Sequence, residues 1–279
     1  AVGYSALTAQ NFTSSTDTHN TAVGYGAGAA VTVGVENTLI GSLAGDALTD
    51  ADYNVAVGVQ ALGSDTLGSR STALGYWSLK TQNFTSATDA YNTAVGFAAG
   101  QVITTGAGNT FLGGLAGDAT TTGDNNTAVG YDALGLNTTA DNNVAVGQDS
   151  MQANTTGAGN TATGVNSLGA NTTGANNTAI GFLALDANTT AGSNTAVGAS
   201  ALTANTTGTE NVSVGQVTLS TNTTGNYNTA VGRAALNENS TGSNNTGIGR
   251  KALEANSTAS DNTAVGAGCL DANTTGTQN

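Results

Sequence analysis

The sequence Asn-Thr-Ala-Val-Gly returns along this chain with one fixed period and almost no drift. From Asn109 onward, the first residue of the repeat recurs at 126, 143, 160, 177, 194, 211, 228, 245, 262 and 279. A period of this length, kept so strictly, is typical of a solenoid, in which each repeat forms one coil that stacks on the coil before it. A solenoid presents repeated surfaces rather than a single pocket, so function has to be sought on those surfaces.

The consensus coil reads Asn-Thr-Ala-Val-Gly-x-x-Ala-Leu-x-x-Asn-Thr-Thr-Gly-x-x, and we number its residues as positions one to seventeen. Position five is Gly in all sixteen occurrences, and position nine is Leu or Met in twelve coils. The alternation in Thr-Ala-Val-Gly is typical of a β-strand. We therefore predict an all-β, parallel β-solenoid whose 17-residue coils each contain two short strands and two turns. Position nine is Gly in four coils, at Gly28, Gly45, Gly100 and Gly117.

The aliphatic residues at positions four and nine are the candidates for the core. Each buried aliphatic side chain contributes about 1.5–3 kcal/mol, so both columns are expected to point inward. The position-four core residues are Val129, Val146, Ile180, Val197 and Val231, and the position-nine core residues are Leu134, Leu168, Leu185, Leu202 and Leu236.

Glycine and asparagine are expected at the corners of the coil. Gly suits a corner because it accepts positive φ and leaves room where a Cβ would clash. Asn at positions one and twelve tolerates left-handed geometry and can stack its amide from coil to coil. The predicted turn glycines at position five include Gly130, Gly147, Gly164, Gly181 and Gly198.

Two coils are longer than the others. A segment within residues 8–19 has a near copy within residues 80–91, and each adds four positions to its coil, so that position five moves from Gly3 to Gly24 and from Gly75 to Gly96. Residues 1–144 thus form two four-coil super-repeats, and residues 145–279 form regular 17-residue coils. We expect one continuous solenoid. Because the chain starts within a repeat and stops at the first residue of another, we expect it to be a piece of a longer protein.

Composition excludes several classes of function. The formal net charge is −13, which repels a phosphate backbone, so nucleic acid is a poor partner. The sequence holds no apolar run near the about 18 residues of a membrane span, and Cys269 has no second cysteine to pair with. The five basic residues are Arg70, Lys80, Arg233, Arg250 and Lys251.

Residues that could support catalysis or metal binding are sparse. His19 is the single histidine, and we interpret it as an exposed loop residue. Asp132 and Asp149 share position seven, and Asp124 and Asp141 share position sixteen. Such two-member ladders could hold Ca²⁺, but the spacing lacks the calcium signature of β-helix repeats. We expect no enzymatic activity, no metal and no cofactor.

The Asn-Thr-Thr segments form a row of glycosylation-type sequons along one edge. The alternative is that these residues only form turns and strands. A stacked threonine ladder would also suit an ice-binding surface, although two consecutive threonines place only one on a given face. The candidate glycosylation sites are Asn137, Asn154, Asn171, Asn188 and Asn205.

Aromatic residues concentrate near the two long coils. They either pack each four-residue insertion against the solenoid or form protruding contact loops for sugars or a protein partner. The candidate contact residues are Phe12, Trp77, Phe84 and Tyr91.

The Asn-Thr-Ala-Val-Gly core, as at Asn126–Gly130 and Asn194–Gly198, resembles the repeats in the heads of trimeric autotransporter adhesins. Those heads are left-handed parallel β-rolls with shorter coils. The longer run NTAVGxxALxxNTTGxx resembles the repeat shafts of phage tail fibres and bacterial surface fibres that end in an endosialidase-type chaperone. The resemblance covers essentially the whole chain. The longer coils of this chain depart from the adhesin pattern, and no chaperone sequence is present.

The resemblance implies a left-handed solenoid within a homotrimeric fibre, located outside the cell or on a virion. We expect the chain to be a structural shaft or adhesion segment whose partners are copies of itself and a cell-surface glycan or receptor, without nucleic acid or membrane insertion. The alternative is a monomeric ice-binding or glycan-binding β-solenoid.

Overall fold

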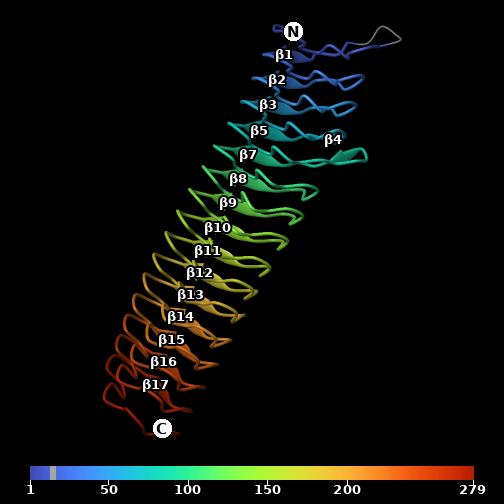
Figure 1. The fold of residues 1–279 in the computed structure, drawn as a ribbon. Coiled ribbons are helices and arrows are strands. Elements are labelled where there is room, and N and C mark those ends of the chain that lie inside the picture. The colour runs from blue at the N-terminus through green and yellow to red at the C-terminus, as the bar shows by residue number, and fades with distance from the viewer. Residues whose placement is uncertain (13–16) are drawn as a thin grey trace. The chain divides into compact units, whose positions relative to one another are not determined.

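Both halves of the chain are parallel β-solenoids (Figure 1). The structure is a computed structural model that describes residues 1–12 and 17–279. It divides into two compact units, Ala1–Asn142 and Asn143–Asn279. Within each unit, every plain coil contributes one three-residue strand that pairs with the strands of the adjacent coils. The prediction of an all-β parallel solenoid with 17-residue coils is confirmed.

In the first unit, successive main strands pair in parallel along one sheet. A second, two-stranded sheet joins β4 to β6. The strands are β1 (Thr21–Val23), β2 (Thr38–Ile40), β3 (Val55–Val57), β4 (Gly68–Ser69), β5 (Thr72–Leu74), β6 (Thr88–Asp89), β7 (Thr93–Val95), β8 (Thr110–Leu112) and β9 (Thr127–Val129).

The second unit repeats this arrangement without insertions, and its strands pair in sequence order. They are β10 (Val144–Val146), β11 (Thr161–Thr163), β12 (Thr178–Ile180), β13 (Thr195–Val197), β14 (Val212–Val214), β15 (Thr229–Val231), β16 (Thr246–Ile248) and β17 (Thr263–Val265).

Among the plain coils that contain strands, only coil 54–70 has a second one, the two-residue β4, so the expectation of two strands in every coil is wrong. After the strand, φ is positive at positions seven and nine and not at position eight between them. Leu183 and Leu185, for example, have φ of 54° and 53°. Side chains other than Gly, Asn and Asp seldom adopt this conformation. These positive φ values are incompatible with a second regular strand, and they turn the chain toward the start of the next coil.

The core lies between positions three and nine, which corrects the prediction for position four. Ala179 at position three is 0% exposed, whereas Ile180 at position four is 41% exposed. Successive residues of a strand point to opposite faces, and here positions one and three take the inner face. The position-nine residues Leu134, Leu168, Leu185, Leu202 and Leu236 are fully buried. Among the residues predicted inward at position four, Val129, Val146, Val197 and Val231 are only half-buried.

Where position nine is Gly, a large side chain at position three of the same or the next coil, on the opposite side of the interior, occupies the space that Leu fills in the other coils. Phe111 replaces the usual Ala at position three and is fully buried. A Cβ added at Gly117 would lie 2.5 Å from the Phe111 ring, and one at Gly100 would lie 2.8 Å from it. Leu39 stands in the same way against Gly45 and Gly28. In the coils of Leu39 and Phe111, the large side chain therefore stands at position three instead of position nine. The glycines of the preceding coils, Gly28 and Gly100, leave room for the same two side chains.

Asparagine side chains run through the interior rather than at the corners. The Asn177 backbone N–H donates to Oδ1 of Asn160 at 2.9 Å, so the position-one amide reaches from coil to coil. At position twelve, Nδ2 of Asn188 donates to Oδ1 of Asn171 at 2.9 Å. Asn177 and Asn188 also both donate to the Ala191 carbonyl. We call these columns the position-one and position-twelve ladders.

The position-five glycines allow the strands to turn where adjacent coils come closest. Gly130, Gly147, Gly164, Gly181 and Gly198 all have φ between 135° and 139°. Gly113 has φ of 144°, and a Cβ there would lie 2.3 Å from the Gly130 carbonyl oxygen. Both the backbone conformation and the space therefore require Gly at this position.

The volume exchange between positions three and nine is testable in one coil. Phe111→Ala should lower stability by about 3–5 kcal/mol through cavity formation, and Gly117→Leu alone should lower it by about 1–3 kcal/mol through overpacking. The double variant recreates the consensus coil, so its cost should be at least about 0.5 kcal/mol smaller than the sum of the single costs. Thermal and denaturant unfolding measure this coupling. Additive costs would contradict the shared-volume account.

Adjacent glycines provide a matched test of the corner. Gly113→Ala should destabilise the first unit by about 2 kcal/mol or more, because it combines backbone strain with a backbone clash. Gly114→Ala should be nearly neutral, because Gly114 lacks positive φ and its Cβ would lie 3.7 Å from the nearest atom. Thermal melting compares the two variants, and equal shifts would show that the corner does not require Gly113.

Candidate functional site

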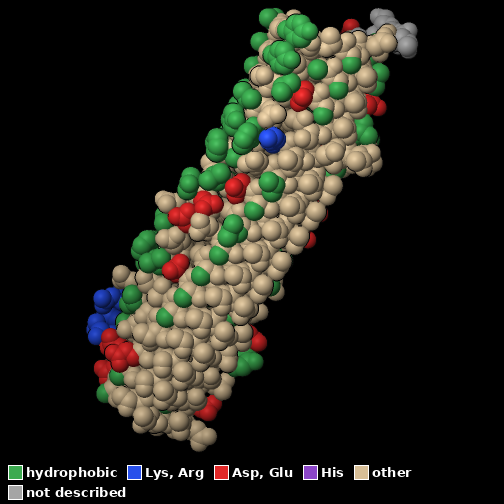
Figure 2. All heavy atoms as spheres, viewed as in Figure 1, with side chains coloured by type: hydrophobic (Ala, Val, Ile, Leu, Met, Phe, Trp, Pro, Cys, Tyr) green, Lys and Arg blue, Asp and Glu red, His purple; other side chains and the backbone are tan. Residues whose placement is uncertain are grey.

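The outer face of each main sheet carries aliphatic side chains that nothing in the described chain covers. Position four supplies Ile40, Leu74 and Leu112 in the first unit, each 38% to 47% exposed. In the second unit, Ile180 and Ile248 are exposed to a similar degree. Hydrophobic side chains gather along the side on which the strands lie (Figure 2). We call positions two, four and six of the coils the outer sheet face.

Aromatic rings extend this face at position six of the first unit. Tyr4 stacks on Tyr25 with ring centroids 5.7 Å apart, and Tyr76 stacks on Phe97 at the same separation. The spacing follows from the strand repeat, because equivalent side chains of adjacent coils lie close to one another. The outer sheet face of the first unit is therefore regular and rich in apolar side chains rather than shaped as a pocket, whereas position six of the second unit also carries Arg233 and Arg250.

The second insertion packs against the solenoid through Phe84, so the prediction that Phe84 is a contact residue is wrong. Its side chain is 7% exposed. Its backbone N–H donates to Oδ1 of buried Asp65 at 3.0 Å, and Nε2 of Gln82 donates to the other carboxylate oxygen at 2.6 Å. The tip at residues 85–87 is exposed, as are Asp89 and Tyr91 farther along the same segment. The main-sheet register continues across the insertion, where Thr72 pairs with Thr93.

The remaining candidate contact residues differ in exposure. Phe12 and Trp77 are half-buried, whereas Tyr91 is 60% exposed. Lys80 Nζ lies 4.1 Å from the Trp77 ring centroid, and Trp77 Nε1 donates to Gln60 Oε1 at 2.8 Å. Trp77 is therefore held by intramolecular contacts. The part of the first insertion at residues 13–16 lies outside the described residues.

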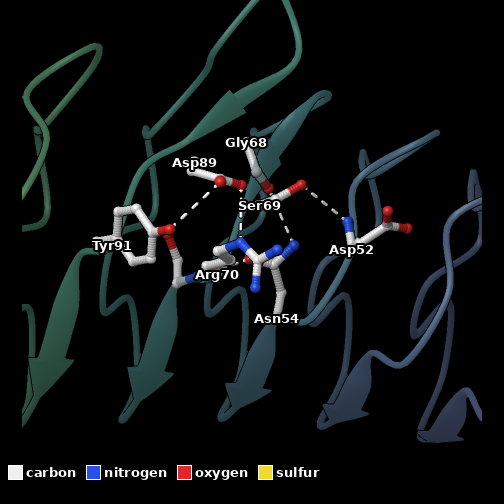
Figure 3. A network of polar contacts seen from close by, with 8 residues as sticks. Asp52, Asn54, Gly68, Ser69, Arg70, Asp89 and Tyr91 are labelled. Carbon is white, nitrogen blue, oxygen red and sulfur yellow. Dashed lines mark hydrogen bonds and ion pairs between the residues drawn. The ribbon is translucent and has the colours of Figure 1, made fainter.

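Tyr91 belongs to a polar and aromatic cluster at the corner that precedes the main strands (Figure 3). Nε of Arg70 lies 2.9 Å from Oδ1 of Asp89, and the Tyr91 hydroxyl donates to Oδ2 of Asp89 at 3.3 Å. The Arg70 guanidinium also lies over the ring of Tyr53, 4.6 Å from its centroid. The hydrogen bond to Asp89 raises the pKa of Arg70 above its ordinary value. We call these four residues the corner cluster.

The sequence pointed to Tyr91 but missed Tyr53, Arg70 and Asp89. Tyr53 and Arg70 occupy position seventeen of successive coils, and Tyr91 is the last residue of the following long coil. Asp89 reaches them because β6 pairs with β4, the strand directly before Arg70. The 17-residue period predicts that Tyr53 and Arg70 lie in one column, but it does not predict that β4 pairs with β6.

The sequon asparagines are buried, which corrects their interpretation as glycosylation sites. Asn137, Asn154, Asn171, Asn188 and Asn205 are all 0% exposed. They belong to the position-twelve ladder, as where Nδ2 of Asn205 donates to Oδ1 of Asn188 at 3.0 Å. A glycan on this nitrogen has no room in the folded coil. The following threonines are also partly engaged, since the Thr172 hydroxyl donates to the Thr189 carbonyl.

Three acidic residues at position ten are held in environments that disfavour their charged form. Burial raises the pKa of Asp118 to about 6, and the charge of nearby Asp132 contributes to the increase. Burial also raises the pKa of Asp46 and of Asp186, each at position ten of its coil. These environments disfavour the charged form of the carboxyl, so its ionisation opposes folding.

The raised pKa of Asp118 predicts that the stability of the first unit depends on pH. The folded pKa of Asp118, about 6, lies above the ordinary value of 3.8, so its contribution to stability is complete below pH 4 and is lost as pH rises through 6. Asp118→Asn should therefore raise stability at pH 7 by about 1 kcal/mol, discounted for partial exposure, and change it little at pH 4. The control is Asp50→Asn, which removes the same charge at an exposed position. Equal effects of both variants at pH 7 would contradict the assignment.

The described surface offers no enclosed binding pocket. Across residues 1–12 and 17–279, no group of three or more His, Cys, Asp or Glu side chains is placed to hold a metal ion. The same residues include no helix long and apolar enough to cross a membrane. Comparison with protein-family models gives no match, and no curated protein is similar in sequence. The outer sheet face and the corner cluster are thus the two candidate sites.

Proposed function

We propose that this chain is the shaft segment of an extracellular homotrimeric fibre on a phage tail or a bacterial surface. In this role it acts as a structural spacer and adhesion element and not as an enzyme, and it requires no cofactor. Its partners are two further copies of itself and a cell-surface glycan or receptor, without nucleic acid or membrane insertion. The solenoid would be left-handed, as in the adhesin heads that its repeats resemble.

The exposed aliphatic column at position four is the observation that carries this proposal. Isolated exposed apolar side chains are ordinary, but a continuous apolar surface marks an interaction site. Positions two and four carry no charged residue in any coil, and charged residues are depleted at the centres of protein interfaces. Burying position four against another chain would enclose mainly aliphatic side chains, whereas the threonine hydroxyls of position two would need hydrogen-bond partners in the interface.

The repeat itself favours copies of the same chain as the occupant. Every coil presents similar side chains at the same positions, so parallel copies in register match coil by coil. Three copies arranged about one axis would cover the outer sheet face of every copy, and this closed symmetry leaves no interface open for further chains. With few basic residues in the chain, apolar burial rather than ion pairing would hold the copies together.

Charges placed on the outer sheet face should prevent assembly. The variant Ile180→Glu with Val214→Glu introduces two carboxylates per chain at position four, where they would be buried next to one another in the trimer. We expect native mass measurement to give three times 27.0 kDa for the parent chain and the monomer mass for the variant.

The matched control is Thr190→Glu with Thr224→Glu, which adds the same charge at exposed position fourteen. We expect this variant to remain trimeric. A parent chain that is monomeric under native conditions would reject the trimeric shaft, and loss of the trimer in both variants would reject the assigned face.

A monomeric ice-binding or glycan-binding solenoid remains the alternative. The regular columns of Thr or Val at position two and aliphatic residues at position four are the observation that favours an ordered-water surface. Thermal hysteresis of a monomeric parent chain, abolished by the position-four glutamates and retained by the position-fourteen glutamates, would select this alternative.

A further inference from the structure

The corner cluster places large side chains at a position where several coils use small or turn-forming residues. Tyr53, Arg70 and Tyr91 have φ of 60°, 63° and 50°. Position seventeen is Asn or Gly in several plain coils, such as Gly108, and these residues accept left-handed geometry readily. The side chains at this corner are not buried, so packing of the core does not select them. Position seventeen is left-handed in the other coils as well, for example at Glu210 and Gln278, so the distinctive feature of this corner is the set of large side chains that it carries.

The cluster is held in one geometry by contacts between its members. One carboxylate oxygen of Asp89 forms an ion pair with Arg70, and the other accepts a hydrogen bond from the Tyr91 hydroxyl. The Tyr53 ring lies against the guanidinium, and the Ser69 hydroxyl, next to Arg70, accepts the Asp52 N–H at 3.0 Å. Figure 3 shows Arg70, Asp89 and Tyr91 converging at this corner. Such mutual support fixes donors, acceptors and rings before any ligand arrives.

We propose that the corner cluster binds a neutral saccharide. The exposed Tyr91 ring, 60% accessible, offers a π face against which the C–H side of a sugar ring can pack. The Asp89 carboxylate accepts hydrogen bonds from sugar hydroxyls, and the further N–H groups of Arg70 donate to them. This inference rests on the adhesion role proposed above and assigns its ligand class and place.

Charge distinguishes a neutral sugar from the other small ligands. The charges of Asp89 and Arg70 cancel each other, and the chain as a whole has a net charge of −13. An acidic sugar would therefore gain little electrostatic attraction to this corner. The guanidinium in turn disfavours a metal cation at the carboxylate. A neutral polyhydroxyl ligand is compatible with both charges, because a hydroxyl group donates to one and accepts from the other.

The chain contains a matched control for this site. Tyr227 also occupies position seventeen, with φ of 58° and 56% exposure. Its neighbours at that position are Glu210 and Asn244, so the paired Arg and Asp are absent there. If an exposed corner tyrosine alone were sufficient, Tyr227 would bind as well as Tyr91.

The experiment measures binding of a panel of neutral methyl glycosides and disaccharides, with sialylated and sulfated members included, by ligand-observed NMR. We expect at least one neutral member to bind. Tyr91→Ala and Asp89→Asn should each weaken that binding at least tenfold, and Tyr91→Phe, which keeps the ring and loses the hydroxyl, should weaken it less. Tyr227→Ala should leave it unchanged.

Binding of no panel member, binding of acidic members alone, or equal losses in Tyr91→Ala and Tyr227→Ala would overturn the proposal. A change of native mass in Tyr91→Ala, with no loss of sugar binding, would instead assign the corner to a chain contact and also overturn it. The position-four glutamate variant separates this test from the shaft proposal, because a monomer that still binds the sugar keeps the corner site while the assembly is lost.

Discussion

The internal asparagine ladders are the constraint on which the rest of the coil depends. A typical position-one amide accepts a backbone N–H from the next coil and donates to a carbonyl at position fifteen, as Asn177 does with Asn194 and Ala191. The same carbonyl receives the position-twelve amide. Among the described residues, no buried side-chain nitrogen or oxygen lacks a hydrogen bond. A buried amide without its partner is costly, so a coil can stack only when its neighbour holds the same register.

The ladders also decide which residues face outward. With Asn at position one directed inward, strand alternation directs position three inward and positions two and four outward. The interior then has room for a methyl group facing a leucine, or for Phe111 facing glycine, and for little else. The larger aliphatic residues of position four are left on the outer sheet face. The feature that makes the coil stackable therefore also gives it an apolar exterior, on which the proposed assembly rests.

The periodicity alone was sufficient to predict the parallel solenoid and the buried leucine column, because both follow from spacing and residue type. The inward valine column was wrong, since alternation defines two faces without saying which is the core. The sequence does contain the missing signal: Leu39 and Phe111 replace Ala only where position nine is Gly, which marks positions three and nine as neighbours. The interpretation of the sequons as glycosylation sites was wrong because Asn137 and its equivalents are buried in the interior, where their side chains form hydrogen bonds. The corner cluster depends on β4 pairing with β6, a contact that local sequence does not encode.

The proposed fibre requires that identical chains cover the outer sheet face, and distances between chains test this requirement directly. Spin labels would be attached through Thr178→Cys or Thr190→Cys, in a chain whose free Cys269 is replaced by Ala. Both sites lie in one coil, Thr178 half-buried at position two and Thr190 exposed at position fourteen. Electron–electron dipolar spectroscopy should give a single interchain distance for each site, shorter at Thr178 than at Thr190. The absence of interchain coupling, or a shorter distance at Thr190, would contradict the proposed assembly.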